Sequence, residues 1–237
     1  VHVHGGYLSG AMQTLKTCFD AQPGRDALLV IADPGMITGQ SYMISGALAA
    51  RIPSLIIEDA PISKHPQRIA SVIYRRKITV LLTGVQQMEY LFSNRELRSI
   101  IQQYDLSSLR AGAFCLEPIH RQIQEFAMEN LVGVFMTTFC SAEMGGITYA
   151  HFYGNPDLRL RADAKAYPMP WIQGDVRVPD MIPDRQGRVR YRQAELGEWG
   201  ELSISRPYPY QALTLWGSGS KVTQADWVGD IRRYNRL

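Results

Sequence analysis

Apolar residues in the first two thirds of the chain follow two patterns that alternate. Short, unbroken apolar runs are separated by longer stretches in which apolar residues recur three or four positions apart. An unbroken run bounded by turn residues is typical of a strand buried on both faces, whereas the wider spacing is typical of an amphipathic helix. The unbroken runs predict strands over residues 27–31, 54–57, 78–82, 111–115 and 131–136.

The stretches between these runs predict helices. The first helix carries Leu8, Leu15 and Phe19, follows an extended segment that ends at Gly5-Gly6, and stops before Pro23-Gly24. The apolar residues that mark the later helices are Tyr42, Ile44, Leu48, Ile69, Val72, Ile73, Met88, Leu91, Phe92, Leu97, Ile100, Ile101, Ile119, Ile123 and Phe126. Because strands separated by helices form βαβ units, the fold class is α/β, with a parallel sheet that helices cover on both faces.

The loops that follow the predicted strands contain small residues and carboxylates. Parallel strands all point the same way, so the loops at their carboxyl ends lie along one edge of the sheet, where open α/β folds bind ligands. We therefore expect phosphate and metal chemistry at this edge. The loops are Asp33-Pro34-Gly35, Glu58-Asp59, Thr83-Gly84, Leu116-Glu117-Pro118 and Ser141-Ala142-Glu143.

The sequence changes character after about Tyr153, where prolines separate short alternating segments. Residues 171–178 and 202–205 read as antiparallel strands, and residues 184–188 as a hairpin tip. This predicts an α/β unit over residues 1–154 and a smaller, barrel-like β-rich unit over residues 155–237.

Composition excludes several classes of protein. The net charge is only +3, and no long run of like charges indicates a nucleic-acid partner. No apolar run reaches the roughly 18 residues of a membrane span. The three cysteines include no C-x-x-C pair, which argues against a disulfide framework and a structural zinc site and favours a reducing, cytoplasmic location. No G-x-G-x-x-G follows a strand, which disfavours a dinucleotide-dependent oxidoreductase.

The segment from Thr137 to Gly146 is the strongest candidate for chemistry. It places one carboxylate, Glu143, in a glycine-flanked turn after a buried strand, where an oxygen ligand can hold a divalent cation. A solvated turn carboxylate is the alternative. The pair His2 and His4 is too thin a ligand set for a metal site on its own. Asp230, which follows Trp227-Val228-Gly229, is either functional or a turn former.

Five motifs in order along the chain resemble the adenylate-forming acyl-CoA ligases, and most closely the acetyl-CoA and propionyl-CoA synthetase branch. The motifs are His2-Val3-His4-Gly5-Gly6-Tyr7, the segment Ala32 to Tyr42, Leu116-Glu117-Pro118-Ile119, the segment Thr138 to Gly146, and Gly229-Asp230. The resemblance implies that a carboxylic acid attacks the α-phosphorus of ATP, and that coenzyme A then receives the acyl group from the acyl-adenylate. ATP or AMP, Mg²⁺, coenzyme A and a small carboxylic acid are thus the implied ligands, with no nucleic acid or membrane partner; homo-oligomerisation is left open.

The resemblance also implies roles for residues of this chain. Glu143 would coordinate Mg²⁺ and, with Thr138, act in catalysis, while Asp230 would accept hydrogen bonds from the ribose. Thr38 would lie near coenzyme A, and the acyl pocket would be lined by Ile37, Cys115 and Cys140. The remaining nucleotide-binding positions would be Leu116, Glu117, Pro118, Thr137, Thr138, Phe139, Cys140, Ser141 and Ala142.

Four departures from the family pattern bear on function. Cys140 stands where acetate-specific members have a tryptophan, which predicts an acid larger than acetate. Leu116, Ala142 and Ile62 replace a glycine, a hydroxyl-bearing residue and an asparagine. The family's phosphate loop and its carboxyl-terminal lysine domain are not in this sequence, so we expect a fragment that does not catalyse adenylation alone. The alternative is a degenerate homologue that serves as a non-catalytic binding or scaffolding module.

Overall fold

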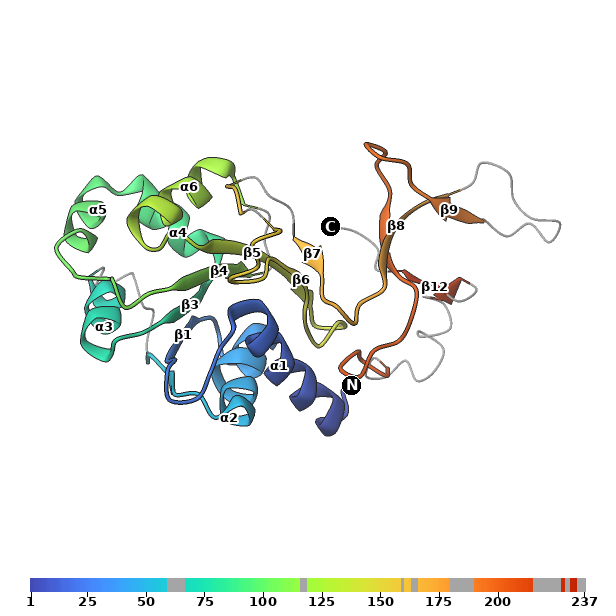
Figure 1. The fold of residues 1–237 in the computed structure, drawn as a ribbon, viewed down its shortest axis with the longest axis horizontal. Coiled ribbons are helices and arrows are strands. Elements are labelled where there is room, and N and C mark those ends of the chain that lie inside the picture. The colour runs from blue at the N-terminus through green and yellow to red at the C-terminus, as the bar shows by residue number, and fades with distance from the viewer. Residues whose placement is uncertain are drawn as a thin grey trace.

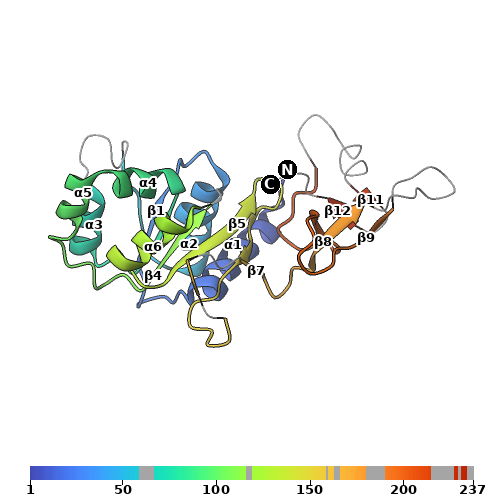
Figure 2. The same ribbon diagram turned by 90° about the horizontal axis from the view of Figure 1, so that it is seen from above.

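Two β-sheets organise the chain in the computed structural model (Figure 1). The structure describes residues 1–58, 67–115, 119–158, 160–162, 166–179 and 190–214, and the backbone alone of residues 227–228 and 231–233. Within these residues, the larger sheet has the strand order β2-β1-β3-β4-β5-β6-β7 and the smaller sheet the order β11-β12-β10-β8-β9. Viewed from above, the smaller sheet lies at one end of the larger one (Figure 2).

The first five strands of the larger sheet are parallel, which confirms the predicted fold class. Each strand pairs in register with its neighbours, as Leu28 of β1 does with Val80 of β3. Two antiparallel strands that the sequence analysis did not predict, β6 and β7, extend this sheet. The strands are β1 (Leu28–Ile31), β2 (Ser54–Leu55), β3 (Val80–Thr83), β4 (Ala111–Cys115), β5 (Phe135–Ser141), β6 (Gly146–Ala150) and β7 (Tyr167–Pro168).

Helices cover both faces of the larger sheet, as predicted (Figure 1). Successive residues of β1 enter different cores: Leu28 and Val30 pack on one face, and Leu29 and Ile31 on the other. The first core includes α1 (His4–Phe19), the π-helix η1 (Gly39–Ser45) and α2 (Gly46–Ala50). The second includes α3 (Arg68–Arg76), α4 (Val85–Ser93), α5 (Arg95–Ile101) and α6 (Arg121–Asn130). No helix of the described residues is long and apolar enough to cross a membrane.

The predicted start of the first helix was wrong. Helix α1 begins at His4, so Gly5 and Gly6 lie inside it rather than in an extended segment. A side chain at Gly6 would place its Cβ 1.9 Å from the carbonyl oxygen of Pro209. The glycine therefore allows a segment from the far end of the chain to pack against the helix, a contact that local sequence cannot reveal.

The predicted limits of the fifth strand were also wrong. The strand does not occupy 131–136; β5 runs from Phe135 to Ser141, and residues 142–145 form the turn to β6. Leu131 instead caps the carboxyl end of α6. The polar segment 137–141 is a strand because β4 and β6 pair with it on either side, with a register shift between Phe139 and Cys140.

The smaller sheet is antiparallel, as predicted, and its strands β8 and β10 fall close to the expected segments, whereas β9, β11 and β12 were not predicted. They are β8 (Gly174–Pro179), β9 (Tyr191–Gln193), β10 (Glu201–Ile204), β11 (Trp227–Val228) and β12 (Ile231–Arg233). The hairpin tip predicted at 184–188 lies outside the described residues. The division into two units at residue 154 stays a prediction.

A buried carboxylate connects three chain segments at the amino-terminal edge of the larger sheet. Asp26, which precedes β1, has no exposed side-chain surface. Its oxygens accept hydrogen bonds from Arg110 Nε at 2.7 Å, Thr79 Oγ1 at 2.8 Å, the Gln22 backbone N–H at 2.8 Å and Arg25 Nη2 at 2.9 Å. Burial by itself raises the pKa of Asp26, but these hydrogen bonds outweigh it and lower the pKa to about 2.

Candidate active site

The loops at the carboxyl ends of β1, β2, β3 and β4 surround two adjoining cavities. The larger, of about 680 Å³, is lined by Val30, Ile31, Ala32, Asp33, Pro34, Met43, Ile56, Ile57, Glu58 and Gln87. The smaller, of about 320 Å³, is lined by Ile31, Ala32, Asp33, Met36, Thr38, Thr83, Gly84, Gln86, Gln87 and Cys115. Ile31, Ala32, Asp33 and Gln87 line both cavities. The edge predicted from strand direction is thus a ligand-sized cleft.

A third cavity, of about 300 Å³, lies beside the turn between β5 and β6. It brings Ala142 and Glu143 of this turn together with Gly35 and Ile37 of the loop after β1. His2, Gln40 and Ala212 also line it. The segment from Asp33 to Ile37 contributes residues to all three cavities. The Glu143 turn therefore belongs to the same edge of the sheet.

The backbone of this turn is fixed by segments far away in the sequence. Tyr208 Oη donates to the carbonyl oxygen of Met144 at 3.1 Å. The backbone N–H of Ala212 donates to the carbonyl oxygen of Glu143 at 2.9 Å. Gly145 has a φ of +77°, and a Cβ there would lie 1.9 Å from the Tyr210 carbonyl oxygen. Only glycine therefore suits this position.

His2 joins the turn to the segment that packs on it. Its Nε2 lies 2.7 Å from the carbonyl oxygen of Ala142, and its Nδ1 lies 3.1 Å from that of Tyr210. The imidazole is thus a bridge between two backbone segments, and in this arrangement both of its nitrogens face main-chain oxygens.

The side chain of Glu143 is free although its backbone is held. It is exposed, and its carboxylate has no ion pair within the described residues. Those residues also contain no group of three or more His, Cys, Asp or Glu that could hold a metal ion. A single free carboxylate fits Mg²⁺ better than it fits a metal that needs a full set of protein ligands, because Mg²⁺ is usually held by one or two carboxylates and the phosphates of its substrate.

Comparison with known proteins agrees with this arrangement. The family model for AMP-binding enzymes matches residues 1–208. The chain belongs to the AMP-binding enzyme family. The resemblance stated from the motifs is thereby confirmed.

Relatives of this AMP-binding chain include acetyl-coenzyme A synthetases. The protein of that name from Pasteurella multocida is 32% identical over 220 residues, which cover 91% of this chain and 31% of the relative. The one from Thiobacillus denitrificans is 31% identical over 220 residues, with the same coverage. The one from Cupriavidus metallidurans is 29% identical over 235 residues, which cover 97% of this chain and 34% of the relative. The chain spans about a third of the length of these relatives.

Of the threonines predicted as site residues, Thr38 and Thr138 are buried. Thr138 Oγ1 donates to the carbonyl oxygen of Phe114 at 2.7 Å and lies 3.4 Å from Cys115 Sγ. Thr38 Oγ1 lies 4.0 Å from Cys140 Sγ. Thr138 therefore ties β5 to β4 through its side chain, and its predicted catalytic role stays a prediction.

The three cysteine thiols are buried and unreactive. Burial raises the pKa of Cys115 to about 11 against a lowering hydrogen bond from Thr138, and it raises the pKa of Cys18 and Cys140 further. Near neutral pH these groups are protonated, and a protonated thiol is a poor nucleophile. The thiols thus act as small apolar side chains, and Cys115 lines the 320 Å³ cavity.

The residues predicted to line one acyl pocket are distributed around the cleft. Cys115 lines the 320 Å³ cavity with Thr38, whereas Ile37 lines the 300 Å³ cavity with Glu143. Cys140 is buried in the core between β5 and the π-helix. Thr137, Phe139 and Ser141 are half-buried on β5.

Several predicted positions lie outside the described residues. These are Asp59, Ile62, Leu116, Glu117, Pro118 and Asp230. Conversely, the sequence analysis did not single out His2 as a backbone bridge, nor Gln86 and Gln87 as lining residues. Gln87 could have been found from its place three residues after Gly84.

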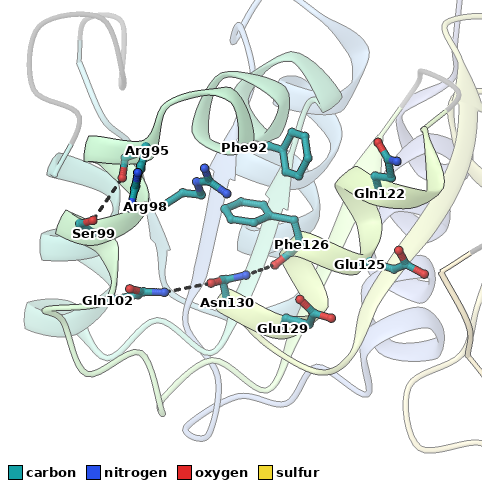
Figure 3. Close-up of a pocket in the computed structure, with 10 residues that line it drawn as sticks. All are labelled: Phe92, Arg95, Arg98, Ser99, Gln102, Gln122, Glu125, Phe126, Glu129 and Asn130. Atoms are coloured by element: carbon teal, nitrogen blue, oxygen red, sulfur yellow. Dashed lines mark hydrogen bonds between the residues drawn. The ribbon is translucent and has the colours of Figure 1, made fainter.

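A fourth hollow lies away from this edge, between α5 and α6 (Figure 3). Its volume is about 490 Å³, and the rings of Phe92 and Phe126 meet edge to face beneath it, with centroids 5.6 Å apart. Arg95 and Arg98 border one side, and α6 forms the other. None of the predicted site residues lines it, so we do not assign it to the AMP-binding site.

Proposed function

We propose that the full-length protein is an ATP-dependent acyl-CoA ligase. It would activate a short or medium carboxylic acid as an acyl-adenylate and transfer the acyl group to coenzyme A. The observation that carries this proposal is the free Glu143 carboxylate, held on a rigid turn beside cavities at the carboxyl edge of a parallel sheet. Membership of the AMP-binding family and the acetyl-coenzyme A synthetase relatives support it.

In this proposal Glu143 would be the protein ligand of a Mg²⁺ ion that binds with ATP. When bound, Mg²⁺ would neutralise part of the negative charge on the phosphates. The chain itself holds the backbone of this turn: Ala212 and Tyr208 donate to the carbonyl oxygens of Glu143 and Met144. The backbone that carries the carboxylate then does not have to be reorganised when the nucleotide binds, which is an advantage of preorganisation.

The acid would bind in the 320 Å³ cavity, between Thr38 and Cys115. The small side chain of Cys115 lies in its wall, and the cavity is lined mostly by apolar or small residues. Each additional CH₂ of a longer acid buried there would contribute about 0.8 kcal/mol. We therefore propose an acid larger than acetate.

A non-catalytic binding module is the second candidate function. Ala142 presents only a methyl group to the cavity beside Glu143, and its carbonyl oxygen is already in contact with His2. A position that offers no hydroxyl to a phosphate favours weak nucleotide binding. In that case the cleft would bind a ligand without turning it over.

The test is pyrophosphate release by the full-length protein with ATP, Mg²⁺, coenzyme A and straight-chain acids from two to eight carbons. Release that is greatest with an acid longer than acetate supports the ligase and the enlarged pocket. Release that is greatest with acetate keeps the ligase and removes the pocket argument. Absence of release with every acid, together with no heat of ATP binding by calorimetry, rejects the ligase.

A further inference from the structure

Residues 2–7 match a motif of the acyl-CoA ligases to which the resemblance gives no role. In the structure this segment contacts parts of the chain that are distant in sequence. Tyr7 Oη lies 2.9 Å from Ser41 Oγ of the π-helix, and His2 contacts the turn that carries Glu143. The motif therefore lies beside the candidate site, and its contacts with the turn indicate what it does there.

The contact between His2 and Ala142 holds the turn on the amino-terminal side of Glu143. His2 Nε2 lies 2.7 Å from the Ala142 carbonyl oxygen, which the backbone N–H of Gly145 also reaches, at 3.3 Å. The hydrogen bond from Ala212 is made on the other side, to the carbonyl oxygen of Glu143 itself. His2 is thus the side chain that fixes the peptide group before the carboxylate, and Ala212 fixes the peptide group after it.

The two peptide groups that flank Glu143 decide where its side chain points. Each peptide group is planar, so the backbone of one residue has two soft dihedral angles, φ and ψ. The peptide group before Glu143 sets φ, and the peptide group after it sets ψ. When both groups are held, the direction of the bond from Cα to Cβ is fixed. Without His2, the peptide group before Glu143 keeps only the longer contact from Gly145 and can turn.

The imidazole of His2 is itself held in place. Its Nδ1 lies 3.1 Å from the Tyr210 carbonyl oxygen, and its ring centroid lies 5.8 Å from that of Tyr7. The ring also lies against Gly145, because a Cβ built there would be 2.9 Å from His2 Cε1. The half-buried ring is therefore confined between residue 210 and the turn, and it presents a donor at a defined point.

We infer that His2 is a positioning residue for the reaction: it donates to the Ala142 carbonyl oxygen and thereby aims the Glu143 carboxylate. This inference rests on the proposed ligase function and adds a residue to its site. His2 acts through the main chain of Ala142 and does not have to touch the nucleotide or the acid. Its removal should therefore weaken what Glu143 does and leave the binding of the acid unchanged.

The experiment measures pyrophosphate release by the full-length protein with variants at His2. His2→Phe keeps a ring but removes both donors, so kcat should fall about 10-fold. KM for the acid should not change, since His2 does not line the 320 Å³ cavity. His4→Phe, which changes an exposed histidine on the first turn of α1, is the matched control and should keep wild-type kcat.

Two amide variants separate the two contacts of the ring. The amide nitrogen of His2→Gln can take the place of Nε2 and donate to Ala142, so this variant should recover most of kcat. The amide nitrogen of His2→Asn can take the place of Nδ1 and reach only Tyr210, so this variant should resemble His2→Phe. Equal recovery by both amides would show that the contact with Tyr210 is sufficient and would overturn the inference.

A double-mutant cycle tests whether His2 acts through Glu143. In the Glu143→Gln background there is no carboxylate to aim, so adding His2→Phe should lower kcat no further. Thermal melting identifies any variant that has lost its fold. A further 10-fold loss in the double variant would mean that the two residues act independently. That result, or wild-type kcat in His2→Phe, would overturn the inference.

Failure of the ligase proposal is distinguishable from failure of this inference, because amide hydrogen exchange needs no turnover. The backbone N–H groups of Gly145 and Ala212 donate to carbonyl oxygens of the turn, so their exchange reports whether it is held. Exchange at both should be about 10-fold faster in the full-length His2→Phe protein and should return to the wild-type rate in His2→Gln. If no acid supports pyrophosphate release, this pattern still supports His2 as the residue that holds Glu143 in a binding module. Equal exchange in wild type and His2→Phe rejects it.

Discussion

Two aspartates border the same strand and have opposite surroundings. Asp26 comes just before β1, is buried, and accepts hydrogen bonds from four other residues. Asp33 comes just after β1, is exposed, and accepts at Oδ1 from the backbone of Gly35. The amino-terminal edge of the sheet thus satisfies its charge internally, while the carboxyl-terminal edge leaves polar groups facing cavities. A satisfied carboxylate stabilises the fold, and an accessible one is available to a ligand.

The same contrast distinguishes the two edges beyond these aspartates. At the amino-terminal edge, Arg110 also lies over the ring of Tyr153, with 4.6 Å from its Cζ to the ring centroid. At the other edge, the Glu143 carboxylate has no ion-pair partner within the described part of the chain, and Gln87 Oε1 has no donor there. Substitutions at the first edge should therefore change stability, and substitutions at the second should change activity.

The largest effect is expected from Glu143→Gln. Loss of the charge should reduce the rate of pyrophosphate release by the full-length protein about 10³-fold, or ~4 kcal/mol of transition-state stabilisation. The unfolding midpoint should not change, because the side chain is exposed. Glu125→Gln, which removes an exposed glutamate paired with Arg121 on α6, is the matched control and should retain full activity. Equal activity of Glu143→Gln and wild type would remove Glu143 from the site.

Asp26→Asn should give the largest loss of stability. The amide cannot accept from all its present donors, and it leaves Arg110 without its carboxylate partner, so the free energy of unfolding should fall by about 3 kcal/mol. Urea denaturation measures this change. Asp33→Asn is the matched control at the other end of β1 and should cost less than about 1 kcal/mol. Similar losses in the two variants would contradict the contrast between the edges.

Acid should destabilise the protein through Asp26. The native pKa of Asp26, about 2, lies below its ordinary value of 3.8, so the unfolded state binds a proton more readily than the native state. The associated stability is present above pH 4 and is lost as the pH falls toward 2, by roughly 2 kcal/mol. Urea titrations between pH 2 and pH 5 should show this slope in wild type and a shallower one in Asp26→Asn. If the free energy of unfolding falls equally steeply with pH in wild type and in Asp26→Asn, other carboxylates cause the loss of stability in acid.

The smallest effect is expected at the hollow between α5 and α6. Arg95 is exposed at its border, and no ion pair of Arg95 occurs within the residues that the structure describes (Figure 3). Arg95→Gln should change stability by less than about 0.5 kcal/mol and leave pyrophosphate release unaltered. Measurable loss of release would show that the hollow, though it lies at neither end of the strands, communicates with the site.

The strands that could be predicted are those in which consecutive apolar residues indicate burial on both faces. β1, β3 and β4 are buried at every position because helices cover both their faces, whereas β5 was misplaced because it contains Thr137, Thr138 and Ser141 and is stabilised by pairing. β6 was missed, since its glycine, threonine and tyrosine carry little apolar pattern. The position of the candidate site followed from strand direction alone.

Contacts between distant segments could not be predicted. Asp26 and Arg110 are 84 positions apart, and nothing near either residue indicates that they form an ion pair. His2 and Ala142 are 140 positions apart.

The turn that carries Glu143 has a consequence for how the protein is made. Its restraints come from His2, at the start of the sequence, and from Tyr208 and Ala212, near the other end. During synthesis, the sheet can form once β5 has left the ribosome, but the turn cannot be fixed until residue 212 has also emerged. Contacts of such long sequence separation form late in folding. The candidate catalytic carboxylate thus acquires its final position later than the parallel strands do.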